Sequence, residues 1–85
     1  LGEWDRALFL TDERLKVNVG DIRLLSFRAH IIERMGKIQD AIQIHRNILK
    51  INPDYKNSLN SVAYLITTLP DPTTEEINEA VDCIR

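Results

Sequence analysis

The chain lacks the features by which several large classes of protein are recognised. It contains one cysteine, Cys83, so an internal disulfide framework is excluded; a reducing compartment such as the cytoplasm is the default expectation, and an exported protein without disulfides is the alternative. It has no stretch of 18 apolar residues and no signal-peptide pattern, so direct insertion into a membrane is not expected. It has no basic run, and its net charge is −2, which argues against nucleic acid as a partner.

The motifs of catalysis and of metal binding are missing too. The two histidines, His30 and His45, do not stand in a His-x-x-x-His spacing, and no Cys-x-x-Cys pair occurs, so neither a metal nor a cofactor is predicted. The chain contains no nucleophile elbow, phosphate-binding loop or dinucleotide motif. Acidic pairs such as Glu75-Glu76 suit helix termini and solvated faces better than acid–base chemistry. The sequence therefore predicts no enzyme and no catalytic residue.

What the chain does contain is an internal repeat, in which similar residues recur at numbers that differ by 34. Toward the N-terminus, the matching pairs are Gly36 with Gly2, Ala41 with Ala7, Ile42 with Leu8, Leu49 with Leu15, Lys50 with Lys16 and Asn52 with Asn18. Toward the C-terminus, they are Leu25 with Leu59, Ala29 with Ala63, Ile31 with Leu65 and Ile32 with Ile66. Matches in one register on both sides of the centre indicate a repeat architecture.

This period, with two helices per unit, resembles the tetratricopeptide repeat (TPR). Ala29 stands at the small position of the first helix, and Ala41 and Pro53 stand at the Ala and closing Pro of the second. The chain departs from the pattern at Arg28, where Leu is usual, and at His45, where Phe is usual. The resemblance implies an all-α fold, with antiparallel helix-turn-helix repeats stacked as a right-handed α-solenoid of about five helices and two and a half units.

The resemblance also divides the chain, which is short enough to be a single domain. Residues 1–21 are expected to form the second helix of a partial unit, residues 22–55 a complete unit, and residues 56–85 the last unit, with an extended inter-helix loop at 69–73. Because the chain starts inside a helix pair and without Met, we expect it to be a fragment of a longer array.

Apolar periodicity and capping residues predict where the helices lie. Five are expected, at residues 3–17, 22–35, 38–51, 54–69 and 74–85. The predicted end signals are Gly20 closing the first helix, Asp21 capping the second, Gly36 in a left-handed conformation, Asn52 capping the fourth with Pro53 at its first position, and a capping box from Thr73 to Glu76. The last helix carries Ile77, Ala80, Val81 and Ile84 on one face, with Ala80 displaced by five positions from the repeat.

Two further expectations concern the histidines and the first helix. We expect His45, on an apolar face, to be a core or rim substitute for the usual aromatic, whereas His30 lies toward the concave face and has a binding role as one interpretation. Trp4 and some of the apolar residues at 8–10 are expected to be less covered, because the partner helix of this unit is missing from the sequence.

In the family, the first helices of successive units line a concave groove that accepts a peptide or partner segment. The residues that the resemblance places in this groove are Arg23, Ser26, Phe27, His30, Glu33, Arg34, Asn57, Asn60, Ser61, Tyr64, Thr67 and Thr68. The six of these residues that lie from Asn57 to Thr68 include no charged residue. They suit hydrogen bonding to an extended backbone, with Tyr64 as an anchor. A protein or peptide partner is the first prediction, and a structural module that stacks on itself or on a neighbouring domain, through exposed repeat ends, is the alternative.

Overall fold

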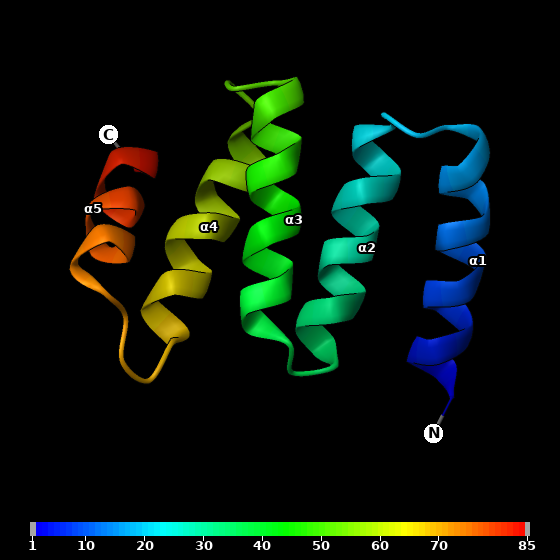
Figure 1. Cartoon of the computed structure of the whole chain (residues 1–85), viewed down its shortest axis with the longest axis horizontal. Coiled ribbons are helices and arrows are strands. Elements are labelled where there is room, and N and C mark those ends of the chain that lie inside the picture. The colour runs from blue at the N-terminus through cyan, green and yellow to red at the C-terminus, as the bar shows by residue number, and fades with distance from the viewer. Residues whose placement is uncertain (1, 85) are drawn as a thin grey trace.

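Within the residues that the structure describes, the chain folds into five α-helices connected by short turns and loops (Figure 1). The computed structural model describes residues 2–84 and spans 35 × 29 × 15 Å. The helices are α1 (Glu3–Val17), α2 (Ile22–Arg34), α3 (Ile38–Ile51), α4 (Lys56–Thr68) and α5 (Thr74–Cys83). The all-α prediction is confirmed, and the bounds of α1 and α3 are those expected from the sequence.

Each helix packs on its neighbours in the chain, α1 on α2, α2 on α3, α3 on α4 and α4 on α5. Figure 1 shows that consecutive helices run in alternate directions, so the two ends of the chain lie at opposite edges of the molecule. The core therefore sits in the middle of the row. Its buried cluster comes from α2, α3 and α4 and consists of Ala29, Ile32, Ala41, Ile42, Ile44, Ile48, Val62, Leu65 and Ile66.

Three of the predicted helix ends are confirmed. Asp21 Oδ1 accepts hydrogen bonds from the backbone N–H groups of Arg23 at 3.0 Å and Leu24 at 3.4 Å, and so caps α2. Thr73 and Glu76 form the reciprocal capping box at the start of α5. Gly36 has a φ of +86°, a left-handed conformation that lets the chain turn directly from α2 into α3.

Helix α1 ends at Val17, as expected, and its C-cap is Asn18, so Gly20 lies in the turn that follows and is not itself the cap. One other helix end was predicted wrongly. Asn52 does not cap α4, and Pro53 is not its first residue. Asn52 instead accepts a hydrogen bond from the backbone N–H of Asp54 at 3.2 Å, which closes a local turn, and the N-cap of α4 is Tyr55.

Two ion pairs connect helices on either side of the core. Arg28 Nε on α2 donates to Asp12 Oδ1 on α1 at 2.7 Å, so the residue that departs from the repeat pattern is used to join two helices. Arg46 on α3 donates through Nε and Nη2 to the two carboxylate oxygens of Glu79 on α5, at 2.9 and 2.6 Å. This second pair is bidentate and fixes α5 against α3 as well as α4.

Candidate functional site

The twelve residues predicted for the groove all lie on α2 and α4. Most of their side chains are exposed, and Ser26, Glu33 and Ser61 are half-buried. The structure brings three of them together. Asn60, Tyr64 and Thr67 follow one another along α4 at helical spacing and line a common hollow between α4 and α5.

This hollow has a volume of about 590 Å³, and most of its walls are apolar. We call it the α4–α5 hollow. The residues that line it are Asn60, Ala63, Tyr64, Ile66, Thr67, Pro72, Ile77, Ala80, Val81 and Ile84. Three large apolar side chains of α5 remain exposed around it, since Ile77, Val81 and Ile84 are 48%, 41% and 68% exposed. An apolar hollow with a few polar groups at one side is typical of a binding site.

The polar groups of the hollow come from α4. The hydroxyl of Thr67 donates to the backbone carbonyl of Tyr64 at 2.6 Å, so its proton is already used within the helix. In the described part of the chain, the amide of Asn60 and the hydroxyl of Tyr64 make no such hydrogen bond, and both are available to a ligand. Tyr64 is 63% exposed, which leaves its ring free to pack against a ligand as well.

The six predicted residues of α2 do not line the α4–α5 hollow. His30 instead meets the ring of Trp4 on α1 edge to face, with ring centroids 6.4 Å apart and an interplanar angle of 75°. Phe27 is 49% exposed and Arg23 is almost fully exposed. The α2 face is therefore accessible to solvent.

The residues of α5 and Pro72 were not among the predicted site residues. The sequence did place Ile77, Ala80, Val81 and Ile84 on one helix face, and Ala80 packs against the core as expected of the small residue of a second helix. The other three are exposed. The signal that could have found them is the apolar stripe itself, in which Ile77, Val81 and Ile84 follow one another at helical spacing.

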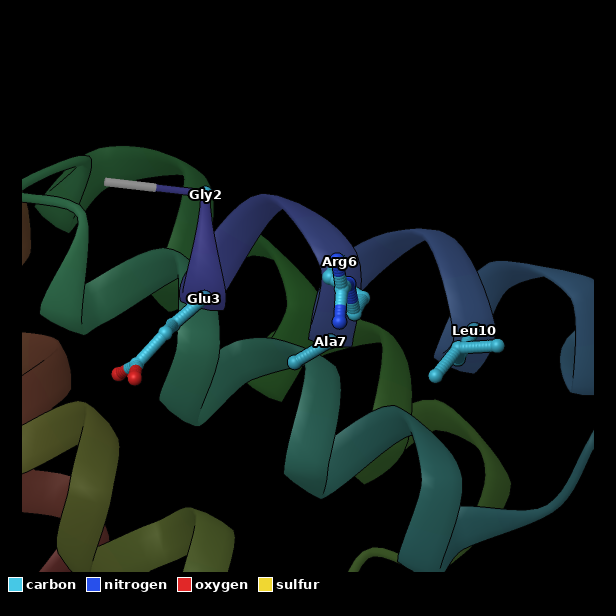
Figure 2. A pocket seen from close by; sticks show the side chains of 5 residues that line it. All are labelled: Gly2, Glu3, Arg6, Ala7 and Leu10. Carbon is cyan, nitrogen blue, oxygen red and sulfur yellow. The ribbon is translucent and has the colours of Figure 1, made fainter.

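A second hollow, of about 390 Å³, lies on the outer side of α1 (Figure 2). Its lining residues are Gly2, Glu3, Arg6, Ala7 and Leu10, and all of them belong to residues 2–10. Figure 2 shows that Glu3, Arg6, Ala7 and Leu10 come from one helix, α1, and Gly2 directly precedes it, so these lining residues belong to a single element. Trp4, Phe9 and Leu10 of α1 are exposed, whereas Leu8 packs against the core cluster. The expectation that apolar side chains of α1 are partly uncovered is therefore confirmed for Trp4, Phe9 and Leu10.

His45 is a core residue, as predicted. It is 4% exposed, and its Nδ1 lies 2.9 Å from Oγ of Ser58, which is fully buried on α4. One of the two atoms donates to the other, depending on the tautomer of the ring. Burial lowers the pKa of the His45 imidazole below its usual value, because a charged ring loses its hydration in the core.

The lowered pKa of His45 makes a prediction about stability. The unfolded chain binds a proton at this ring below a pH of about 6.5, while the folded chain resists it, so the free energy of unfolding should fall as the pH drops from about 7.5 to about 5. Urea unfolding at a series of pH values measures this dependence. The double variant His45→Phe, Ser58→Ala removes the ring and leaves no hydroxyl unpaired. An equally steep pH dependence in that variant would contradict the assignment to His45.

The described residues hold no group of three or more His, Cys, Asp or Glu side chains placed to bind a metal ion. Burial raises the pKa of the Cys83 thiol, and the nearby Glu79 carboxylate raises it further, so the thiolate is disfavoured at neutral pH. None of the helices over residues 2–84 has the length and apolar character that crossing a membrane requires.

Comparison with known proteins finds no family model that matches the chain and no curated protein with significant sequence similarity to it. The α4–α5 hollow is therefore interpreted from its own geometry and from the internal repeat.

Proposed function

We propose that the protein is an interaction scaffold that binds a peptide or a segment of a partner protein along the exposed faces of α2 and α4. The observation that carries this proposal is the α4–α5 hollow, where Asn60 and Tyr64 stand beside the exposed apolar side chains of α5. Such a surface combines apolar area for affinity with a few polar groups for orientation.

We further propose that the helices are TPR units of a right-handed α-solenoid, with α2 and α4 as first helices of successive units. The helix bounds support this assignment, because Ile22 and Lys56 begin the two helices and Arg34 and Thr68 end them, a shift of one repeat period in both cases. The same shift separates the last residues of α1 and α3, Val17 and Ile51. In this arrangement the faces of α2 and α4 belong to one concave groove.

The proposal is tested with a triple variant, His30→Ala, Asn60→Ala, Tyr64→Ala. A random-peptide display library is selected against the wild-type protein, and the selected peptides are synthesised and measured by fluorescence anisotropy. We expect the triple variant to bind them at least about tenfold more weakly, since an exposed aromatic anchor alone is commonly worth more than about 1 kcal/mol in a binding surface. Circular dichroism checks that the variant is folded.

The matched control is Phe9→Ala, Gln43→Ala, Asn47→Ala, which removes one aromatic ring and two polar side chains from exposed positions on α1 and α3. If the triple variant bound the peptides as tightly as the wild type and the control variant lost binding, the binding site would lie on another face of the protein. Selection of no peptide, together with a mass that rises with protein concentration in sedimentation experiments, would favour the structural module. The exposed Trp4, Phe9 and Leu10 are the surface that this alternative would use.

A further inference from the structure

Helix α5 is attached to the rest of the protein in two different ways, one on α4 and one on α3. Its contact with the core cluster beside α4 is made by Ala80 and Cys83, which are half-buried. No residue from Thr74 to Cys83 is fully buried. Among the side-chain hydrogen bonds and ion pairs of residues 2–84, none joins α5 to α4, and those that connect α5 to another helix all end on α3. The directional contacts of α5 are therefore made with α3.

The first of these contacts is at the start of α5. Oε2 of Glu76 accepts a hydrogen bond from Nε2 of Gln39 on α3 at 3.1 Å. Oε1 of the same carboxylate accepts a hydrogen bond from the backbone N–H of Thr73 at 2.8 Å, which is one half of the capping box. One side chain thus caps α5 and joins its first turn to α3.

The second contact is the bidentate pair of Arg46 with Glu79, one turn further along α5. The two side chains are 33% and 31% exposed, so the pair is partly shielded from solvent. Glu76 and Glu79 stand three residues apart on α5, which places them on one face of the helix. Two contacts on one face fix the rotation of α5 as well as its position. We call the two contacts together the α3 latch.

The position of α5 decides the shape of the α4–α5 hollow, because α5 supplies one of its walls. Ile77 and Val81 of that wall lie on the same short helix as the two glutamates of the latch. The walls are connected by the loop at 69–73, where Pro70 and Pro72 restrict the backbone. A change in the latch would therefore move the wall on α5 as a unit relative to the wall on α4.

We propose that Gln39 and Arg46 are positioning residues for the α4–α5 hollow, and that α5 docks and undocks reversibly as the α3 latch closes and opens. Neither residue lines the hollow, so both act through α5. The inference rests on the proposed function, since a ligand that contacts both walls binds only the docked form. Ligand binding and closure of the latch then stabilise each other.

Cys83 provides a measure of docking that needs no ligand. It is the single cysteine of the chain, it lies on α5, and it packs against the core cluster when α5 is docked. The rate at which an uncharged disulfide reagent modifies its thiol therefore reports the undocked population. Arg46→Met should raise this rate by about fivefold or more, because it removes a bidentate, partly shielded pair. Gln39→Ala removes the weaker contact and should raise the rate by about twofold.

The charge on Arg46 lowers the pKa of the Cys83 thiol. Removing that charge would by itself slow the reaction, because the thiolate is the reactive form. Faster labelling in Arg46→Met thus reports undocking and not a change in thiol chemistry. The charge-exchanged double variant Arg46→Glu, Glu79→Arg should restore slow labelling, whereas high salt should speed labelling in the wild type and have little effect on Arg46→Met.

The matched control is Arg28→Met. The Arg28 side chain is also 33% exposed and pairs with Asp12 at 2.7 Å, but this pair joins α1 to α2. If Cys83 reacts through undocking of α5, the control should label within about twofold of the wild-type rate. Equal acceleration by Arg28→Met and Arg46→Met would mean that labelling follows unfolding of the whole chain, and would overturn the inference. Equal rates in the wild type and Arg46→Met would overturn it too.

The peptides selected against the wild type connect the latch to the hollow. At about ten times its Kd, a peptide that binds only the docked form should slow labelling by about tenfold. Cys83 does not line the α4–α5 hollow, so a peptide bound there does not cover the thiol directly. A bound peptide that left the labelling rate unchanged would overturn the inference, since the latch would then not act on the hollow. Faster labelling in Arg46→Met alone would support the latch even if no peptide were selected, and that failure would count against the proposed function only.

Discussion

Ile48→Ala should lower the free energy of unfolding by about 2–5 kcal/mol, the range for truncating a large aliphatic side chain in a packed core. Ile48 is 0% exposed and lies on α3, the helix at the centre of the row, in a cluster with side chains of α2 and α4. A chain of 85 residues has a total stability on the order of 5–10 kcal/mol. The variant should therefore melt at least about 10 °C below the wild type in a circular-dichroism scan.

Its control is Ile51→Ala, the same chemical change one turn further along α3. Ile51 is 52% exposed, so little buried area is lost, and the expected effect is below about 1 kcal/mol. Similar losses in the two variants would mean that the core does not have its centre at Ile48.

Ala41→Leu should destabilise the protein by about 1–3 kcal/mol, because it adds volume where none is free. Ala41 is 0% exposed and lies in the core cluster with Ala29, at the packed junction of α2 and α3. A larger side chain there must push the two helices apart or leave its preferred rotamer. Urea denaturation followed by circular dichroism measures the loss.

The repeat supplies an internal control for this substitution. Ala7 precedes Ala41 by the repeat period of 34 residues, and it lines the open hollow on the outer side of α1 (Figure 2). Ala7→Leu should change the stability by less than about 0.5 kcal/mol, since the added atoms extend into solvent. The pair of variants compares one sequence position in a covered and an uncovered setting. A loss at Ala7 as large as that at Ala41 would show that the substitution acts through α-helix propensity or the unfolded state instead of packing.

The helices could be predicted from the sequence because most of the signals are local. Apolar periodicity locates α3, and short-range capping bonds at Asp21 and Thr73 locate the starts of α2 and α5. The start of α4 was predicted too early, at 54 instead of Lys56. The side chain of Asn52 could have capped α4, but it accepts a hydrogen bond from the backbone N–H of Asp54 instead. Tyr55, which packs against the core, takes the N-cap position of α4. That choice depends on tertiary packing, which local patterns do not contain.

Only the α4 wall of the candidate site could be predicted from the sequence. The repeat register placed Asn60, Tyr64 and Thr67 on one exposed face of α4, and they do line the hollow. The opposite wall was missed because an apolar stripe alone does not say whether it faces a core or solvent. Val81 and Ile84 are apolar, like residues of the core, but they are as exposed as surface residues.

Packing between neighbours in the chain also has a kinetic consequence. Short turns connect helices that already lie next to each other, so little loop-closure entropy opposes their pairing, and rapid folding from the α2–α3 hairpin outward is expected. The terminal helices should open first, since α5 has no buried residue and α1 has only Thr11. The α4–α5 hollow thus lies on a part of the protein that opens more readily than the centre. A ligand bound there would slow amide exchange in α5 and leave exchange in α1 unchanged, so binding at the hollow would be detected as a local gain of order in the terminal helix.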